Sequence, residues 1–194
     1  LPESRTWKPN IFARKPDTTF TIPVAFDMFL NKNYYKKILK QIADSPLDTT
    51  KKYIYSDLHF YLYPEMVSQL TNTDFNSYLQ KTYQQIGANS LVFNPWKDDL
   101  TNVIPTEYDS IFRQQLLHGY VHDEGAALTG GISGHAGLFG NANDLMKIMQ
   151  MYLQNGKYGH VSFINSDVIS ECTSYQFPNE KNRRGIGFDK KDFN

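Results

Sequence analysis

The sequence predicts a mainly α-helical protein with a few short strands. Apolar residues recur three and four positions apart, as on one face of a helix, in residues 34–43, 57–70, 74–86 and 144–154. The β-prone runs between them are short and are interrupted by proline or glycine. With 194 residues, of which 40% are hydrophobic and 14% aromatic, the chain can bury one sizeable core, so we expect a single domain over residues 1–194.

Prolines and glycines predict how these segments begin and end. The first 20 residues contain three prolines and are predicted to form an irregular extended arm, with Trp7 among its anchors. Residues 19–24 are β-prone, but Pro23 restricts them to an edge strand. Pro64 predicts a kink or a restart within the helical segment 57–70.

Two other segments are less periodic. Residues 97–110 are polar and predict a loop, whereas 111–117 predict one or two helical turns. Residues 184–188 read as the start of a strand.

Composition gives little reason to expect a polyanionic partner. Lys and Arg together number 20, as do Asp and Glu, so electrostatics favours neither nucleic acid nor an anionic membrane. The single cysteine, Cys172, excludes an intrachain disulfide. The sequence has no apolar run near 18 residues, and both ends look cut from a longer protein.

The first candidate for chemistry is Tyr55-Ser56-Asp57. An aromatic, β-branched run ends here at two good helix-capping residues, and helix-compatible residues follow. A tyrosine in this place would have its phenol held by a rigid helix start. An ordinary capped helix with a packed tyrosine explains the same pattern, and the spacing alone leaves both interpretations open.

A serine nucleophile is not evident in the sequence. No serine has a lysine three residues later, the helical spacing that would let an amine reach its hydroxyl. Residues 131–135 break the Gly-x-Ser-x-Gly pattern, and Cys172 is better explained as a packed thiol.

A polar cluster runs from His118 through His122, Asp123 and Glu124, with His135 shortly after. His118 and His122 would share a helix face and could hold a metal with a carboxylate, but Gly119 weakens the helix. We therefore expect no metal. Instead, His122, Asp123 and His135 should lie close together and brace the glycine-dense turn at 130–140 by hydrogen bonds.

These residues together resemble a known family. Tyr55-Ser56-Asp57 before a helix resembles the Tyr-x-Asn element of class C β-lactamases and low-molecular-mass penicillin-binding proteins. Residues 119–126 and 130–145 look like the pattern of one subgroup, in which a His-Asp loop leads to Gly-His-Ala-Gly-Leu-Phe and a helix. The resemblance extends from about residue 53 to residue 189.

The resemblance implies part of a β-lactamase/transpeptidase-like α+β fold, mostly its helical lobe. It implies that Tyr55 transfers protons, that Ser56 and Asp57 lie at the substrate, and that Gly134 and His135 form a site wall. Asp57 stands where the family has Asn and cannot donate an amide N–H to a substrate carbonyl. That difference leaves D-Ala-D-Ala peptidase or esterase activity open beside β-lactamase activity.

The resemblance further implies an internal fragment of a serine hydrolase that is inactive alone, because the Ser-x-x-Lys and Lys/His-Thr-Gly elements are missing. It implies no cofactor, a small-molecule or peptidoglycan-peptide substrate for the parent protein, an extracytoplasmic location, and a possible N-terminal glycoside hydrolase domain in the parent. Two alternatives remain. One is a non-catalytic binding or scaffold domain, and the other is a metal-dependent hydrolase using His118, His122 and Asp123.

Overall fold

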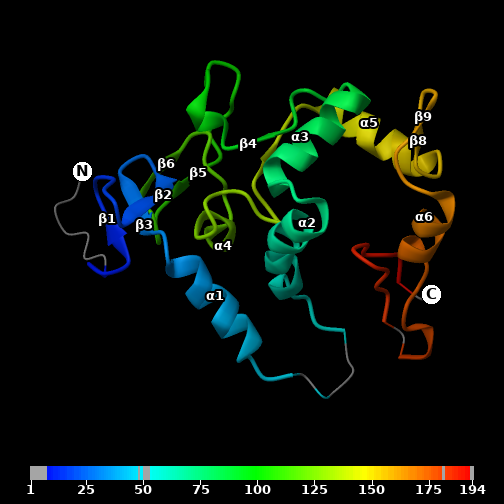
Figure 1. Ribbon diagram of the computed structural model, residues 1–194, viewed down its shortest axis with the longest axis horizontal. Helices are drawn as coiled ribbons and strands as arrows, with labels where there is room; N and C mark the ends of the chain where they lie inside the picture. Colours follow the sequence, from blue (N-terminus) through cyan, green and yellow to red (C-terminus); the bar gives the residue numbers. More distant parts are fainter. Residues whose placement is uncertain (1–7, 48, 50–52, 181, 193–194) are drawn as a thin grey trace. The chain divides into compact units, whose positions relative to one another are not determined.

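The computed structural model describes residues 8–47, 49, 53–180 and 182–192 (Figure 1). The chain divides into two compact units. The first unit comprises Leu1–Ser45, Asp57–Gln80 and Leu91–Phe139, and the second comprises Pro46–Ser56, Lys81–Ser90 and Gly140–Asn194. A single domain over 1–194 stays a prediction. Trp7 lies outside the described residues.

A three-stranded antiparallel sheet opens the first unit (Figure 1). Its order is β1 (Phe12–Ala13), β3 (Met28–Asn31), β2 (Phe20–Ala25). The predicted edge strand is confirmed, because β2 pairs only with β3 and carries Pro23. Strand β1 lies within the segment predicted as an irregular arm.

The predicted helices of the first unit are confirmed. Helix α1 spans Tyr34–Ala43. The segment predicted at 57–70 divides into a 3₁₀ helix, η1 (Leu58–Leu62), and helix α2 (Tyr63–Thr71). The restart falls at Pro64, in the first turn of α2, where its missing N–H costs no helical hydrogen bond.

Helix α3 spans Phe75–Ile86 and is shared by the two units in sequence. Its start is capped by Asp74, whose Oδ1 atom accepts the N–H of Ser77 at 3.0 Å. Gly87 follows its end in a left-handed conformation, with φ of 75°.

A β-hairpin replaces the loop predicted at 97–110 and the helical turns predicted at 111–117. Strand β5 (Glu107–Asp109) pairs antiparallel with β6 (Gln115–Leu117). The Asp109 carboxylate accepts the N–H groups of Ile111 and Phe112 at 3.0 and 2.8 Å and so closes the turn. This side-chain turn outweighs the weak helical spacing, and both predictions are wrong here.

Four short elements complete the first unit around the glycine-rich segment. Strand β4 (Val92–Phe93) pairs with β7 (Leu138–Phe139), and the 3₁₀ helix η2 spans Pro95–Lys97. Helix α4 spans Glu124–Ala127, and Asp123 is the residue that caps its N-terminus.

The buried cluster of the first unit lies mostly on strands and on α4, not on the long helices. Helices α1 and α2 contain no buried residue. Five of the eight residues of this cluster therefore lie on strands β2, β3 and β6. The cluster comprises Val24, Ala25, Met28, Leu30, Leu117, Val121, Ala126 and Ala127.

The second unit contains α5 (Ala142–Leu153), the strand pair β8 (Lys157–Tyr158) and β9 (Val161–Ser162), α6 (Ser166–Thr173) and η3 (Pro178–Glu180). Helix α5 is capped by Asn141 and begins at Ala142, two residues before the predicted start. The strand predicted to start at residues 184–188 is not formed. Instead, Arg184 makes an isolated antiparallel β-bridge with Asp189. The fold is thus a set of helices with small antiparallel sheets, as the sequence predicts.

Within the described part of the chain, none of the helices has the length and apolar character that crossing a membrane requires.

Candidate functional site

Tyr55 lies in irregular chain just before η1, and its side chain is 67% exposed. It belongs to the second unit together with the half-buried Ser56, whereas Asp57 begins the next segment of the first unit. Asp57 is the residue before η1, but its side chain makes no capping hydrogen bond. The predicted side-chain cap at Asp57 is therefore absent, although Tyr55 does precede a helical segment as predicted.

Two arginines pack against the tyrosines of this segment. The Arg184 guanidinium carbon lies 5.6 Å from the centre of the Tyr55 ring and 5.1 Å from that of Tyr53. Arg183 lies 5.2 Å from the Tyr53 ring. Cations at such distances are attracted to the negative faces of aromatic rings. Sequence reasoning missed this cluster, although Tyr53 and Tyr55 are two apart and share one side of an extended chain.

Asp123 is the polar centre of the first unit. Its Oδ1 atom accepts the N–H of Ala126 at 2.6 Å, which caps α4, and also lies 2.9 Å from Nε2 of His135. Burial by itself raises the pKa of the Asp123 carboxyl, but the hydrogen bonds from Ala126 and His135 outweigh it, and the pKa lies below its usual value. The carboxylate is therefore ionised at neutral pH.

His135 connects this carboxylate to Ser133. Its Nδ1 atom lies 2.9 Å from Oγ of Ser133, and its side chain is only 4% exposed. Because the ionised Asp123 can only accept, Nε2 carries a proton, and a neutral ring then accepts the Ser133 hydroxyl proton at Nδ1. The Tyr61 ring covers the imidazole with centroids 4.4 Å apart.

The glycine-rich segment allows the close backbone approach that this network needs. A Cβ atom at Gly134 would collide with the backbone carbonyl of Phe60. Gly131 has a φ of 77°, and a Cβ atom there would collide with the side chain of Asn94. Asn94 in turn donates to the carbonyl of Gly130 at 2.8 Å. The hydrogen bond between His135 and Asp123 in addition connects this segment to the start of α4.

His122 does not join this network. Its Nδ1 atom lies 2.9 Å from Oε1 of Glu107, and its side chain is 71% exposed. Its backbone carbonyl accepts instead from the buried Arg113, whose guanidinium also bonds Asp109 and the carbonyl of Val121. The prediction that His122 braces the turn with His135 is wrong, because the hairpin β5–β6 supplies a nearer carboxylate.

The helix that a metal site at His118 and His122 would require is also absent. Strand β6 ends at Leu117, and Nε2 of His118 lies 2.6 Å from the carbonyl oxygen of Val103. Among the described residues, no three His, Cys, Asp or Glu side chains are grouped as metal ligands.

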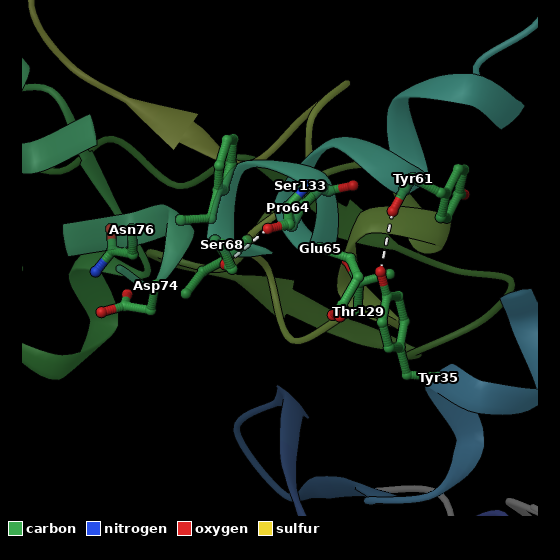
Figure 2. Close-up of a pocket in the computed structure, with 11 residues that line it drawn as sticks. Tyr35, Tyr61, Pro64, Glu65, Ser68, Asp74, Asn76, Thr129 and Ser133 are labelled. Carbon is green, nitrogen blue, oxygen red and sulfur yellow. Dashed lines mark hydrogen bonds between the residues drawn. The ribbon is translucent and has the colours of Figure 1, made fainter. Parts of the chain in front are cut away.

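Asp123, His135 and Ser133 are connected in the same order as the residues of a Ser-His-Asp triad, with the histidine between the carboxylate and the hydroxyl. However, Ser133 is buried. Its neighbour Gly134 is packed against backbone, so the hydroxyl is fixed within a wall. Ser133 also lines a pocket of the first unit, shown in Figure 2. The network therefore serves to hold the glycine-rich segment in place.

Asp57 also lies near this wall. The pKa of the Tyr61 phenol is raised by burial, and then by the negative charges of Asp123 and Asp57. Tyr61 thus stays protonated where it covers His135.

Comparison with known proteins finds relatives by sequence, but no matching family model or solved structure. Proteins named "Putative D-alanyl-D-alanine carboxypeptidase" from Salmonella schwarzengrund (strain CVM19633) and from Salmonella typhi are each 30% identical to it, over 74% of this chain. The chain spans 39% of the length of these relatives. It is therefore similar, over most of its own length, to proteins that bear the name of a D-alanyl-D-alanine carboxypeptidase.

Proposed function

We propose that this chain is part of a penicillin-binding-protein-like serine hydrolase that cleaves D-Ala-D-Ala-like peptides of the cell wall. The observation that carries the proposal is the similarity to the Salmonella relatives of that name over 74% of the chain. It agrees with the resemblance of Tyr55-Ser56-Asp57 and residues 130–145 to that class of enzyme.

In this proposal Tyr55 transfers protons, and Ser56 and Asp57 border the substrate. The exposure of Tyr55 supports the role, since a phenol that transfers protons must reach the substrate. Asp123, Gly134 and His135 form a rigid wall through the contacts described above, and His122 lies beside it. Asp57 is a carboxylate and cannot donate to a carbonyl oxygen, which favours peptidase or esterase chemistry over β-lactam hydrolysis.

The acylated serine would come from outside these 194 residues, since no serine here has a lysine three positions later. The isolated chain would then be inactive. The longer protein would act outside the cytoplasm on peptidoglycan peptides, and a glycoside hydrolase domain would fit the same setting.

Labelling with a fluorescent penicillin tests the proposal. The isolated chain should give no band that survives denaturation, because a tyrosine cannot replace the acylated serine. The full-length protein encoded by the same gene should give such a band. A labelled isolated chain would place the nucleophile within these residues, and an unlabelled full-length protein with no Ser-x-x-Lys would favour a binding or scaffold domain.

A further inference from the structure

A pocket of about 260 Å³ lies in the first unit, between α1, α2, the start of α3 and residues 129–133 at the beginning of the glycine-rich segment (Figure 2). None of the groups placed in the proposed reaction at Tyr55, Ser56 or Asp57 lines it. Its lining residues are Tyr35, Tyr61, Pro64, Glu65, Ser68, Asp74, Phe75, Asn76, Thr129, Ile132 and Ser133.

The walls of the pocket are largely apolar. Three of its lining side chains are aromatic, namely Tyr35, Tyr61 and Phe75, and Pro64 and Ile132 add aliphatic surface. Such walls suit a short alkyl chain, and aromatic faces attract a cation.

The hydroxyl protons around the pocket are directed into the protein. Tyr35 donates to the carbonyl of Tyr61 at 3.0 Å, Ser68 to that of Pro64 at 2.8 Å, and Thr129 to that of Ala126 at 2.8 Å. Figure 2 shows the first two of these bonds as dashed lines. Each hydroxyl has already used its one proton, so towards the pocket it can offer only lone pairs.

Two of the remaining polar side chains are charged and accept hydrogen bonds. Glu65 and Asp74 contribute carboxylates, and no lysine, arginine or histidine is among the described residues that line the pocket. Burial and then the negative charge of Glu65 raise the pKa of the Tyr35 phenol, which stays protonated at neutral pH.

Asn76 provides a third acceptor that lacks a partner. Its Oδ1 atom is buried and accepts no hydrogen bond from the described part of the chain. A buried oxygen without a donor carries a free-energy cost that a ligand's N–H group would remove.

We propose that this pocket binds a primary alkylammonium group. An ammonium ion has three donors and a positive charge, which complement the two carboxylates and the Oδ1 atom of Asn76, an acceptor that has no partner in the described part of the chain. Its charge is balanced by Glu65 and Asp74, and its alkyl chain lies against Tyr35, Tyr61 and Phe75. The proposal does not depend on the peptidase relationship, because its lining and its chemistry are separate from Tyr55.

The amine has two possible sources, the side chain of a peptide or a free alkylamine. Two probes distinguish them: Nα-acetyl-L-lysinamide carries the ammonium group on a peptide-like body, whereas n-butylammonium carries it alone. Tighter binding of the first indicates a peptide ligand, and equal or tighter binding of the second indicates a free amine.

The test is a titration of the isotope-labelled 194-residue chain followed by amide chemical shifts in NMR. Both amines should produce saturable shifts centred on residues 64–76 and 129–133, and n-butanol and butyrate, which match the chain length without the cation, should bind more weakly. Glu65→Gln and Asp74→Asn should each weaken binding about two- to fivefold, as expected for loss of one exposed charge interaction.

Both substitutions retain the local structure. Asn at position 74 is as good a helix cap as Asp, and Gln at position 65 can still bond Gln69, which now donates to Glu65 at 2.7 Å. Glu171→Gln, an exposed change on α6, is the matched control and should leave binding unaltered. Butanol binding as tightly as butylammonium, or no saturable shift at these residues, would overturn the proposal.

Discussion

The Nε2 atom of His135 lies 2.9 Å from the Oδ1 atom of Asp123, across twelve residues of chain. The same oxygen also accepts the N–H of Ala126, one of the free N–H groups in the first turn of α4. One carboxylate thus caps a helix and holds the glycine-rich segment against it. Because one side chain has two structural roles, its removal should lower the free energy of unfolding substantially.

Replacing Asp123 with Ala should lower the free energy of unfolding by about 2–4 kcal/mol, which combines a lost cap with an unpaired buried imidazole. Urea denaturation measures the change. Asp123→Asn is the matched control, because its amide oxygen still caps α4. A cost below about 0.5 kcal/mol for the alanine variant would show that neither contact stabilises the first unit.

Removal of the Arg113 side chain should also lower the stability of the protein substantially. Its guanidinium is fully buried, lies 2.7 Å from Oδ2 of Asp109, and donates to the carbonyls of Val121 and His122. Arg113→Ala should cost about 3–5 kcal/mol, because it leaves a buried carboxylate unpaired.

Lys40→Ala is the matched control for Arg113→Ala. It breaks an exposed pair with Asp44, at 3.1 Å, and should cost about 0–1 kcal/mol. Equal losses of unfolding free energy for Arg113→Ala and Lys40→Ala, measured by urea denaturation, would contradict the prediction that the buried ion pair contributes more than the exposed one.

The hairpin around Arg113 also shows where reasoning from sequence reached its limit. Periodicity located α1 and α3 because each has a long apolar face and clear end signals. The hairpin β5–β6 has strands of only three residues and depends on the side chain of Asp109 and on Gln114 at a φ of 52°. A non-glycine residue in the left-handed region has no reliable sequence signal.

In the candidate site, too, the sequence predicts some contacts and not others. The sequence predicts the pairing of Asp123 with His135, because a carboxylate and an imidazole flank a segment rich in glycine. It does not predict that His122 turns towards Glu107, since that contact depends on the hairpin. The lining of the pocket in Figure 2 comes from segments far apart in sequence, so no local pattern could reveal it.

The second unit should lose stability in acid through Asp144. The hydrogen bond from Lys147, followed by that from the backbone N–H of Ser90, lowers the pKa of this carboxyl to about 2. A folded-state pKa below the unfolded value means that the stabilisation is present above about pH 4 and is lost as the pH falls through about 2.

The carboxyl carbon shift of Asp144, followed by NMR, should therefore titrate near the lower value. Asp144→Asn should reduce the dependence of unfolding on pH in that window. A titration midpoint near 4 would contradict the lowered pKa.

The last prediction concerns Tyr55 in the proposed full-length hydrolase. Tyr55→Phe should lower the rate of acylation about 10²–10⁴-fold if the phenol is a general base. The change removes only the hydroxyl, so the ring keeps its contact with Arg184 at 5.6 Å and the fold is retained. Tyr53→Phe is the matched control, since its ring packs on the same guanidinium but has no proposed role in proton transfer. Stopped-flow acylation by a chromogenic ester gives both rates. Similar small losses in the two variants would leave Tyr55 with only a packing role, whereas a large loss confined to Tyr55 would identify its phenol as the group that moves the proton.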